Sequence, residues 1–315
     1  MEEQQKTGLK WKFTRKKKEM NLLERNGLIF TIIVLIPIFI NFIVFWFGVN
    51  INSISLAFIT KDLETGKEIF SFYHFEKLFR ELKSVDTAIG GALVNTLKYF
   101  VVHLIKIFLS VTIAYFFYKK VPGHLLYKIL FYLPAMVPSM VYIIMFKEII
   151  GVYGPIYTAV QKIFGYTMPP LLAQPSTATN TILFYVLWSG FGTSMLIYVG
   201  AMNRIPGEVL DAANLDGCGM AREFIQIVMP LIWETFGTYF LLAFTGIFME
   251  TGPLLYFVGY DTTLKTQTLN YWIFLQVKGG QYNYPSAIGL FFSLCTVPFV
   301  IFSRWMITRI ETVTY

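Results

Sequence analysis

The chain has 315 residues, of which 55% are hydrophobic, 18% aromatic and 14% charged, and its formal net charge is +7. Soluble globular domains carry about 25% charged residues, so this composition excludes an ordinary soluble domain and indicates an integral membrane protein. The two cysteines, Cys218 and Cys295, offer neither a disulfide framework nor the spacing of metal ligands.

The N-terminal 27 residues form a basic segment that includes four consecutive basic residues, Arg15 to Lys18. The apolar run that follows, residues 28–49, is longer than the apolar region of a signal peptide, and no A-x-A-like cleavage site comes after it. We therefore interpret residues 1–27 as a cytoplasmic segment and the run as a retained membrane helix.

Six apolar runs are long enough to cross a membrane as helices, because a hydrocarbon core of about 30 Å requires about 20 helical residues. They cover residues 28–49, 93–118, 129–150, 181–202, 236–258 and 286–307. Pro134, Pro138 and Pro298 lie inside these runs and predict kinks in a packed bundle. We predict an all-α integral membrane fold with six transmembrane helices in one domain over residues 28–315.

Lysine and arginine are distributed unevenly between the two sides of this arrangement. The segments on the side of the N-terminus hold 15 of them, against eight in the segments on the other side. Cytoplasmic segments of membrane proteins carry the excess of these residues. We therefore expect both termini, and the connection between the fourth and fifth helices, to be cytoplasmic.

That connection, residues 205–232, is unusually polar for this chain. Pro206 and Glu208 suit the first turn of a helix, where the positive end of the helix dipole favours an acidic side chain. Gly217 and Gly219 then permit a sharp turn before a second apolar stripe. The pattern predicts a helix, a turn and a second helix at the membrane face. It suits either an ordinary amphipathic connector or a docking surface for a protein partner; an anionic lipid surface would favour more lysine and arginine.

The same stretch resembles the cytoplasmic EAA loop of ABC importer permeases. The matching positions are Ile205-Pro206, Asp211-Ala212-Ala213, Asp216-Gly217, Phe224, Ile227 and Met229-Pro230. The chain departs from the usual pattern in having Asp211 in place of glutamate, Cys218 in place of alanine and Met229 in place of leucine. The resemblance implies a coupling helix that docks on an ATPase subunit. The residues it places there are Glu208, Asp211, Ala212, Ala213, Asp216 and Gly217.

Other stretches are similar to the maltose-type, carbohydrate-uptake branch of these permeases: GALVNTLKYF, LPAMVPSMVYIIMF, TQTLNYWIF and YNYPSAIGLFFSL. The T-G-G-G-P turn common in that branch is replaced here by FVGYD, residues 257–261. The resemblance implies the type I ABC importer permease fold in a bacterial cytoplasmic membrane. It also implies a subunit of a binding-protein-dependent importer for a sugar or oligosaccharide. The implied partners are a second permease subunit in a heterodimer, two ABC ATPase subunits and an extracytoplasmic solute-binding protein, with no nucleic acid.

The chain has no G-x-x-x-x-G-K-[ST] nucleotide-binding motif and no cluster of metal ligands or nucleophile with its base. We therefore expect a transport subunit rather than an enzyme, with no catalytic residue, metal or cofactor of its own, and ATP bound by the partner ATPases. Two alternatives remain open. They are an ABC importer permease for an amino acid, phosphate or polyamine, and a secondary transporter, for which Glu250 alone would offer a coupling carboxylate.

Glu250 is an acidic residue inside the fifth apolar run, where a charge is costly and usually faces the interior of the bundle. It suits either a substrate contact or a structural ion pair with a residue such as Lys106. Counted from the loop, the resemblance to maltose-type permeases implies a substrate pathway. The residues it places there are Ser189, Gly190, Thr193, Ala243, Gly246, Ile247 and Glu250. We expect His103 to be a satisfied residue of the bundle interior.

Overall fold

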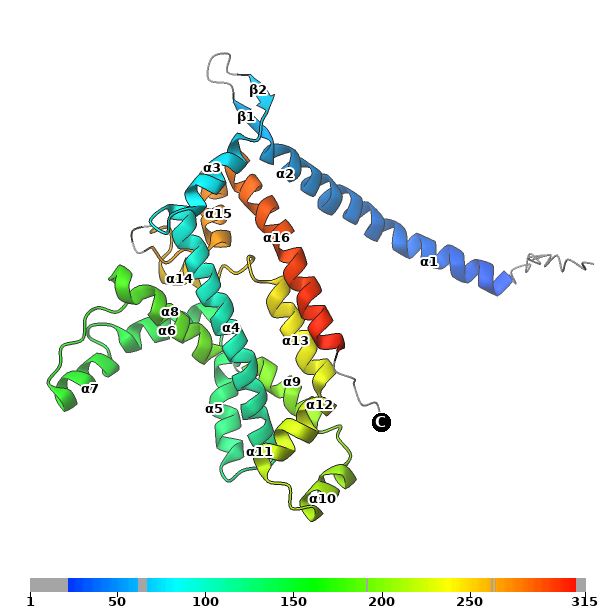
Figure 1. The fold of residues 1–315 in the computed structure, drawn as a ribbon, viewed down its shortest axis with the longest axis vertical. Helices are drawn as coiled ribbons and strands as arrows, with labels where there is room; N and C mark the ends of the chain where they lie inside the picture. Colours follow the sequence, from blue (N-terminus) through cyan, green and yellow to red (C-terminus); the bar gives the residue numbers. More distant parts are fainter. Residues whose placement is uncertain (1–21, 62–66, 191, 262, 264, 310–315) are drawn as a thin grey trace, which may run out of the picture. The chain divides into compact units, whose positions relative to one another are not determined.

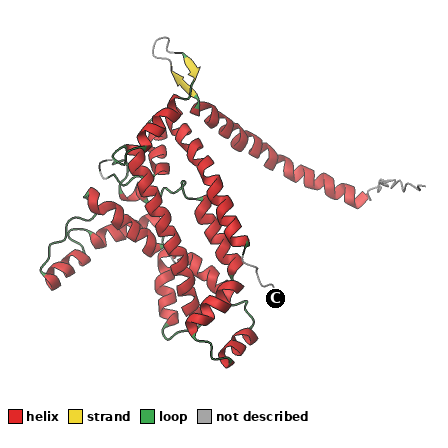
Figure 2. Ribbon diagram, in the orientation of Figure 1, coloured by secondary structure: helices red, strands yellow, loops and turns green. Residues whose placement is uncertain are grey.

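The computed structural model describes residues 22–61, 67–190, 192–261, 263 and 265–309 (Figure 1). The chain divides into two compact units, residues 1–53 and residues 54–315, which are described separately. The basic run at residues 15–18 lies outside the described residues. Helices dominate both units, and two short strands accompany them in the second (Figure 2).

The first unit is helical throughout its described part. It contains α1 (Leu22–Asn41), the π-helix η1 (Phe42–Gly48) and the beginning of α2 (Val49–Ala57), which crosses the division between the units. Residues 25–57 have a mean hydropathy of 2.9 in their most apolar stretch, and they include the predicted first span. Two polar side chains of this part bond to backbone carbonyls one turn away. Thr31 donates to Gly27 at 2.8 Å and Asn50 to Trp46 at 2.6 Å.

The second unit begins with a small β-hairpin, which the predicted all-α fold lacked. β1 (Ile59–Lys61) pairs antiparallel with β2 (Glu68–Phe70), so that Ile59 lies opposite Phe70. The ring of Phe58 stacks on that of Phe70 with the centroids 5.3 Å apart. The amphipathic helix α3 (Tyr73–Leu82) follows and packs on the N-terminal part of α4.

The central helix of this unit is α4 (Ala88–Tyr118), which has 31 residues. Thr87 caps it, because its hydroxyl accepts a hydrogen bond from the Gly90 amide at 3.0 Å. Its neighbours lie on several sides: α8 (Pro175–Ser189), α9 (Gly192–Met202), α13 (Trp233–Thr245) and α15 (Leu269–Lys278) all pack against it. Figure 1 shows α8 on one side of α4, and α9 and α13 on the other.

The third and fourth predicted spans are each interrupted. The run 129–150 is divided between α5 (His124–Met136) and α6 (Ser139–Ile150), and α7 (Pro155–Phe164) follows. The break falls at Val137, which adopts an extended conformation because the next residue is Pro138. Pro134, by contrast, is accommodated within α5. The run 181–202 is divided between α8, which ends at Ser189, and α9, which begins at Gly192.

The fifth span differs most from its prediction. Helix α13 ends at Thr245, and the chain then runs through a non-helical segment, residues 246–253, before the short helix α14 (Leu254–Phe257). Gly252 has φ +55° and Pro253 follows it, so this segment cannot continue the helix. The helical stretch Met220–Leu231 precedes α13 at a bend of 78°. The described residues contain five helices long and apolar enough to span a membrane, or six if this bent pair forms one span.

The predicted polar connection forms a helical hairpin at the end of the unit where α4 finishes (Figure 1). Its first arm is α10 (Gly207–Leu215). Its second arm consists of α11 (Met220–Glu223), the π-helix η2 (Phe224–Val228) and α12 (Met229–Leu231). The unit ends with α16 (Asn283–Thr308), which packs on α13.

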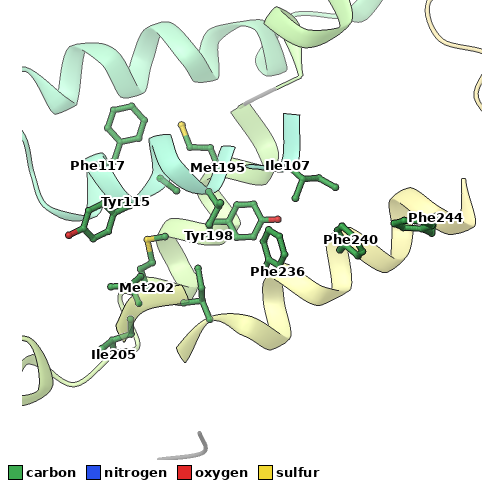
Figure 3. Packing of buried hydrophobic residues seen from close by; sticks show 14 residues of the cluster. Ile107, Tyr115, Phe117, Met195, Tyr198, Met202, Ile205, Phe236, Phe240 and Phe244 are labelled. Atoms are coloured by element: carbon green, nitrogen blue, oxygen red, sulfur yellow. The ribbon is translucent and has the colours of Figure 1, made fainter. Parts of the chain in front are cut away.

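The largest buried cluster among the described residues lies between the C-terminal half of α4, α9 and α13. Figure 3 shows its aromatic and aliphatic side chains meeting between these helices. Tyr198 and Met202 of α9 are fully buried, and Phe236, Phe240 and Phe244 follow one another along one face of α13. This cluster fixes the three helices beneath the cavity described below.

Two glycines of α9 provide a test of this packing. A Cβ atom at Gly192 would lie 2.9 Å from the carbonyl oxygen of Phe131 and 3.1 Å from the Cβ atom of Ala135, whereas a Cβ at Gly200 would meet nothing within 4 Å. We expect Gly192→Ala to destabilise the protein by about 1–3 kcal/mol, because the close approach of α5 to α9 leaves no room for a methyl group. Gly200→Ala is the matched control, and its gain in helix propensity should leave stability unchanged or slightly higher. Thermal unfolding of the two purified variants in detergent measures the difference; equal Tm values would contradict the packing.

Candidate functional site

A cavity of about 350 Å³ lies between α4, α9, α13 and the non-helical segment after α13. Its walls combine aromatic and aliphatic side chains with hydroxyl, amine, imidazole and carboxylate groups. The lining residues are Phe100, His103, Lys106, Ile107, Gly190, Thr193, Ser194, Tyr239, Leu242, Ala243, Gly246, Ile247 and Glu250.

The structure brings together six of the seven residues predicted for the substrate pathway. Gly190, Thr193, Ala243, Gly246, Ile247 and Glu250 all line the cavity. Ser189, the last residue of α8, is not among its lining residues. Sequence reasoning did not assign His103 and Lys106 to the cavity, although residues three apart on a helix such as α4 share one face.

Glu250 lines the cavity, but the backbone that carries it differs from the prediction. The fifth apolar run suggested a position within a helix, but Glu250 belongs to the non-helical segment that follows α13. Its Oε2 atom lies 2.8 Å from Nε2 of His103, and its Oε1 atom accepts a hydrogen bond from the Gly252 amide at 2.6 Å. His103, rather than the expected Lys106, is therefore the side chain in direct contact with this carboxylate.

Lys106 reaches the cavity because Gly190 leaves room for it. A Cβ atom at position 190 would lie 2.4 Å from Cδ and 3.1 Å from Nζ of Lys106. The side chain therefore passes over the end of α8 in the space that any larger residue would occupy. The side chains of Glu250 and His103 keep 28% and 25% of their surface exposed, and both residues line the cavity.

The segment that carries Glu250 is held by hydrogen bonds from the beginning of α15. Thr268 donates its hydroxyl to the Glu250 carbonyl at 2.7 Å, and Asn270 donates its amide to the Met249 carbonyl at 2.7 Å. Two residues of α4 hold the beginning of α15 in turn. Asn95 donates to the carbonyls of Lys265 and Gln267, and the Thr96 hydroxyl accepts from the Leu269 amide at 2.9 Å. The motifs GALVNTLKYF and TQTLNYWIF thus position the cavity carboxylate.

The chemistry of this cavity suits a polar solute of small-molecule size. The hydroxyls of Thr193 and Tyr239 offer hydrogen-bond donors and acceptors, and Phe100 supplies an apolar aromatic wall. Among the described residues, no group of three His, Cys, Asp or Glu side chains could hold a metal ion.

The helical hairpin carries the residues predicted to couple to an ATPase. Five of these residues are exposed: Glu208, Asp211, Ala212, Asp216 and Gly217. Ala213 is only 6% exposed and packs inward, so its methyl group supports α10. Leu215, which the motif did not single out, is 89% exposed at the end of the same helix. Gly217 has φ +70°, the left-handed conformation that ends α10 and that L-residues rarely adopt.

These features agree with the comparisons with known proteins. Residues 106–312, more than half of the chain, match the family described as the binding-protein-dependent transport system inner membrane component. The protein is thus a multi-pass membrane component of a transport system. It belongs to the binding-protein-dependent transport system inner membrane component family.

Similar curated proteins are permeases. The chain is 26% identical over 274 residues to the probable ABC transporter permease protein YesP of Bacillus subtilis, covering 77% of this chain and 84% of YesP. It is 24% identical over 206 residues to the multiple sugar-binding transport system permease protein MsmF of Streptococcus mutans, covering 64% of this chain and 69% of MsmF. With the maltose/maltodextrin transport system permease protein MalF of Shigella flexneri it shares 28% identity over 135 residues, covering 41% of this chain and 26% of MalF. The matched region is therefore about a quarter of the length of MalF.

The fold is also found in a solved structure. A chain of a bacterial ABC transporter involved in the import of the acidic polysaccharide alginate superimposes with a TM-score of 0.75 at 20% sequence identity. The superposition covers 92% of this chain and 98% of the other. The architecture is therefore the type I ABC importer permease fold predicted from the sequence.

The contact between His103 and Glu250 can be measured by a double-mutant cycle. We expect His103→Gln and Glu250→Gln each to lower the Tm, because each leaves a partly buried polar group without its partner. The double variant should lose less stability than the sum of the two, with a coupling of about 0.5–3 kcal/mol. Thermal unfolding of the four proteins in detergent gives this quantity. Strictly additive losses would show that the two side chains do not interact.

Proposed function

We propose that this chain is one permease subunit of an ATP-driven, binding-protein-dependent importer for a sugar or oligosaccharide. The observation that carries the proposal is the polar cavity at the junction of α4, α9 and α13, in a chain of this family and fold. Relatives named for maltose/maltodextrin and multiple-sugar transport support the choice of substrate class.

The chemistry of the cavity supports a carbohydrate cargo. Sugars present hydroxyls around an apolar ring face, so they suit sites that combine polar groups with an aromatic surface. Thr193, Tyr239, His103 and Glu250 provide the polar groups, and Phe100 provides an aromatic one. The charged groups also suit a non-sugar solute such as an amino acid, phosphate or polyamine, which is the second candidate. Family membership favours either importer over a secondary transporter.

The proposed assembly contains a second permease subunit, two ABC ATPase subunits and an extracytoplasmic solute-binding protein. The ATPases bind ATP, and this chain contributes no catalytic residue or cofactor. Nucleotide-driven closure then stabilises one of two states of the pathway. The excess of lysine and arginine on the side of the N-terminus supports a cytoplasmic position for both termini and for α10.

Uptake by cells that lack this gene tests the substrate class. We expect selective loss of uptake for one labelled mono- or oligosaccharide, restored by the intact chain, while uptake of amino acids, phosphate and polyamines continues. Ala243→Trp should fail to restore it, because the indole would occupy the cavity that Ala243 lines. Leu294→Trp, on an exposed part of α16, is the matched control and should restore it. Loss of a control solute with intact sugar uptake would retain the importer and replace its cargo.

The coupling helix can be tested at two glycines of one turn. A Cβ atom at Gly217 or at Gly219 would meet nothing within 4 Å, but Gly217 has φ +70° and Gly219 has φ −72°. We expect Gly217→Val to displace α10 and to reduce both uptake and the amount of ATPase that co-purifies, because valine is strained at positive φ. Gly219→Val should have little effect.

Asp211→Lys reverses an exposed charge on α10 without changing the backbone, and it should also weaken co-purification of the ATPase. Unchanged ATPase binding and uptake in both Gly217→Val and Asp211→Lys would remove the coupling role from this loop.

A further inference from the structure

The second arm of the coupling hairpin carries a buried acid that neither the motif nor the family description assigns. Glu223, in α11, is 1% exposed. Both of its carboxylate oxygens lie 3.0 Å from Nζ of Lys119, the residue directly after α4. Its Oε1 atom also accepts a hydrogen bond from the Tyr115 hydroxyl at 3.0 Å. Tyr115 and Lys119 are four residues apart at the end of α4, so two side chains from one helix end bind this carboxylate.

The contact also includes the backbone of α11. The Tyr115 hydroxyl lies 3.1 Å from the carbonyl oxygen of Met220, the first residue of that helix. The Tyr115 ring packs on that of Phe224 with the centroids 4.9 Å apart. The end of α4 therefore contacts α11 at its first residue, its last residue and the residue that follows.

A charge pair is a costly way to hold two helices together. Each buried ion loses several kcal/mol of hydration, and well-packed apolar residues often replace such a pair without loss of stability. The aromatic contact between Tyr115 and Phe224 already supplies apolar packing at this junction. The ion pair between Lys119 and Glu223 adds geometric specificity, because its hydrogen bonds restrict how α11 can slide or rotate on α4.

The gripping helix is the one that reaches the cavity. α4 runs without interruption from Ala88 to Tyr118. His103 and Lys106 line the cavity, and Tyr115 lies about 18 Å along the axis from His103 at the helical rise of 1.5 Å per residue. A displacement of α11 that is passed to Lys119 therefore moves one wall of the cavity as part of a rigid element.

We propose that Lys119, Glu223 and Tyr115 form a latch that makes α4, and with it the cavity wall at His103 and Lys106, move with the coupling hairpin. The three residues position α4 and do not contact the ATPase or the transported solute. The proposal rests on the proposed function, because it assigns a route for the movement that the ATPase produces.

The test uses the full importer complex and a reporter cysteine in the cavity. Thr193→Cys, in a chain whose Cys218 and Cys295 are replaced by serine, is labelled with N-ethylmaleimide in the resting complex and after trapping with Mg-ATP and vanadate. With an intact latch, nucleotide should change the labelling rate about fivefold or more. Glu223→Gln and Lys119→Met should abolish most of this change while the same amount of ATPase co-purifies. Lys120→Met is the matched control, since Lys120 is exposed and forms no ion pair with any described residue.

A double variant separates positioning from simple stability. Lys119→Met with Glu223→Met removes both charges and leaves two apolar side chains, so we expect the Tm to recover toward that of the parent while the nucleotide response stays low. Three results would overturn the latch. They are a normal response in both single variants, a response that recovers together with the Tm in the double variant, and loss of the ATPase from the single variants. A parent complex that binds no ATPase would instead refute the proposed function, and the latch with it.

Discussion

The arrangement of this protein depends on one constraint: inside a bilayer, every backbone amide and carbonyl must find a partner within the protein. An unbroken helix satisfies the constraint by itself, as α4 does. The segment after α13 does not, and it is tolerated because side chains of α15 bond to its carbonyls at residues 249 and 250. Non-helical backbone in a membrane protein is found where protein or a cavity surrounds it. Here it carries the carboxylate of the cavity.

The apolar runs were sufficient to predict the helical class and the approximate position of each span, because crossing a membrane requires length and hydropathy alone. They could not predict where α13 ends. Residues 246–258 are apolar enough to extend the span. Gly252 and Pro253 prevent a continuous helix through this segment, and hydrogen-bond partners at the beginning of α15 stabilise its non-helical backbone. Those partners lie 18 to 21 residues away in the sequence and cannot be found from hydropathy. The break at Val137 was easier to foresee, because Pro138 acts on its immediate neighbour.

The cavity residues, too, could be predicted only where the information is local in the sequence. The positions of Thr193, Ala243 and Gly246 could be counted from a recognisable loop, and all three line the cavity. The side chain that contacts Glu250 could not be predicted by counting positions from the loop. Two basic groups of α4 lay within plausible reach, and the choice of His103 over Lys106 depends on the turn made by residues 250–252, which brings the carboxylate to the imidazole and to the Gly252 amide. The buried pair of Lys119 and Glu223 was equally hidden, since nothing local distinguishes Glu223 from the exposed acids of the same hairpin.

Two broken helices give the cavity an electrostatic character that its side chains alone do not show. Gly190 directly follows α8 and Gly246 directly follows α13, and both glycines line the cavity. The last carbonyls of a helix have no partners within it, so each helix end contributes a partial negative charge. Lys106 extends across Gly190, where its ammonium group lies beside the end of α8. The helix ends and Glu250 therefore oppose the positive charge of Lys106 within the cavity.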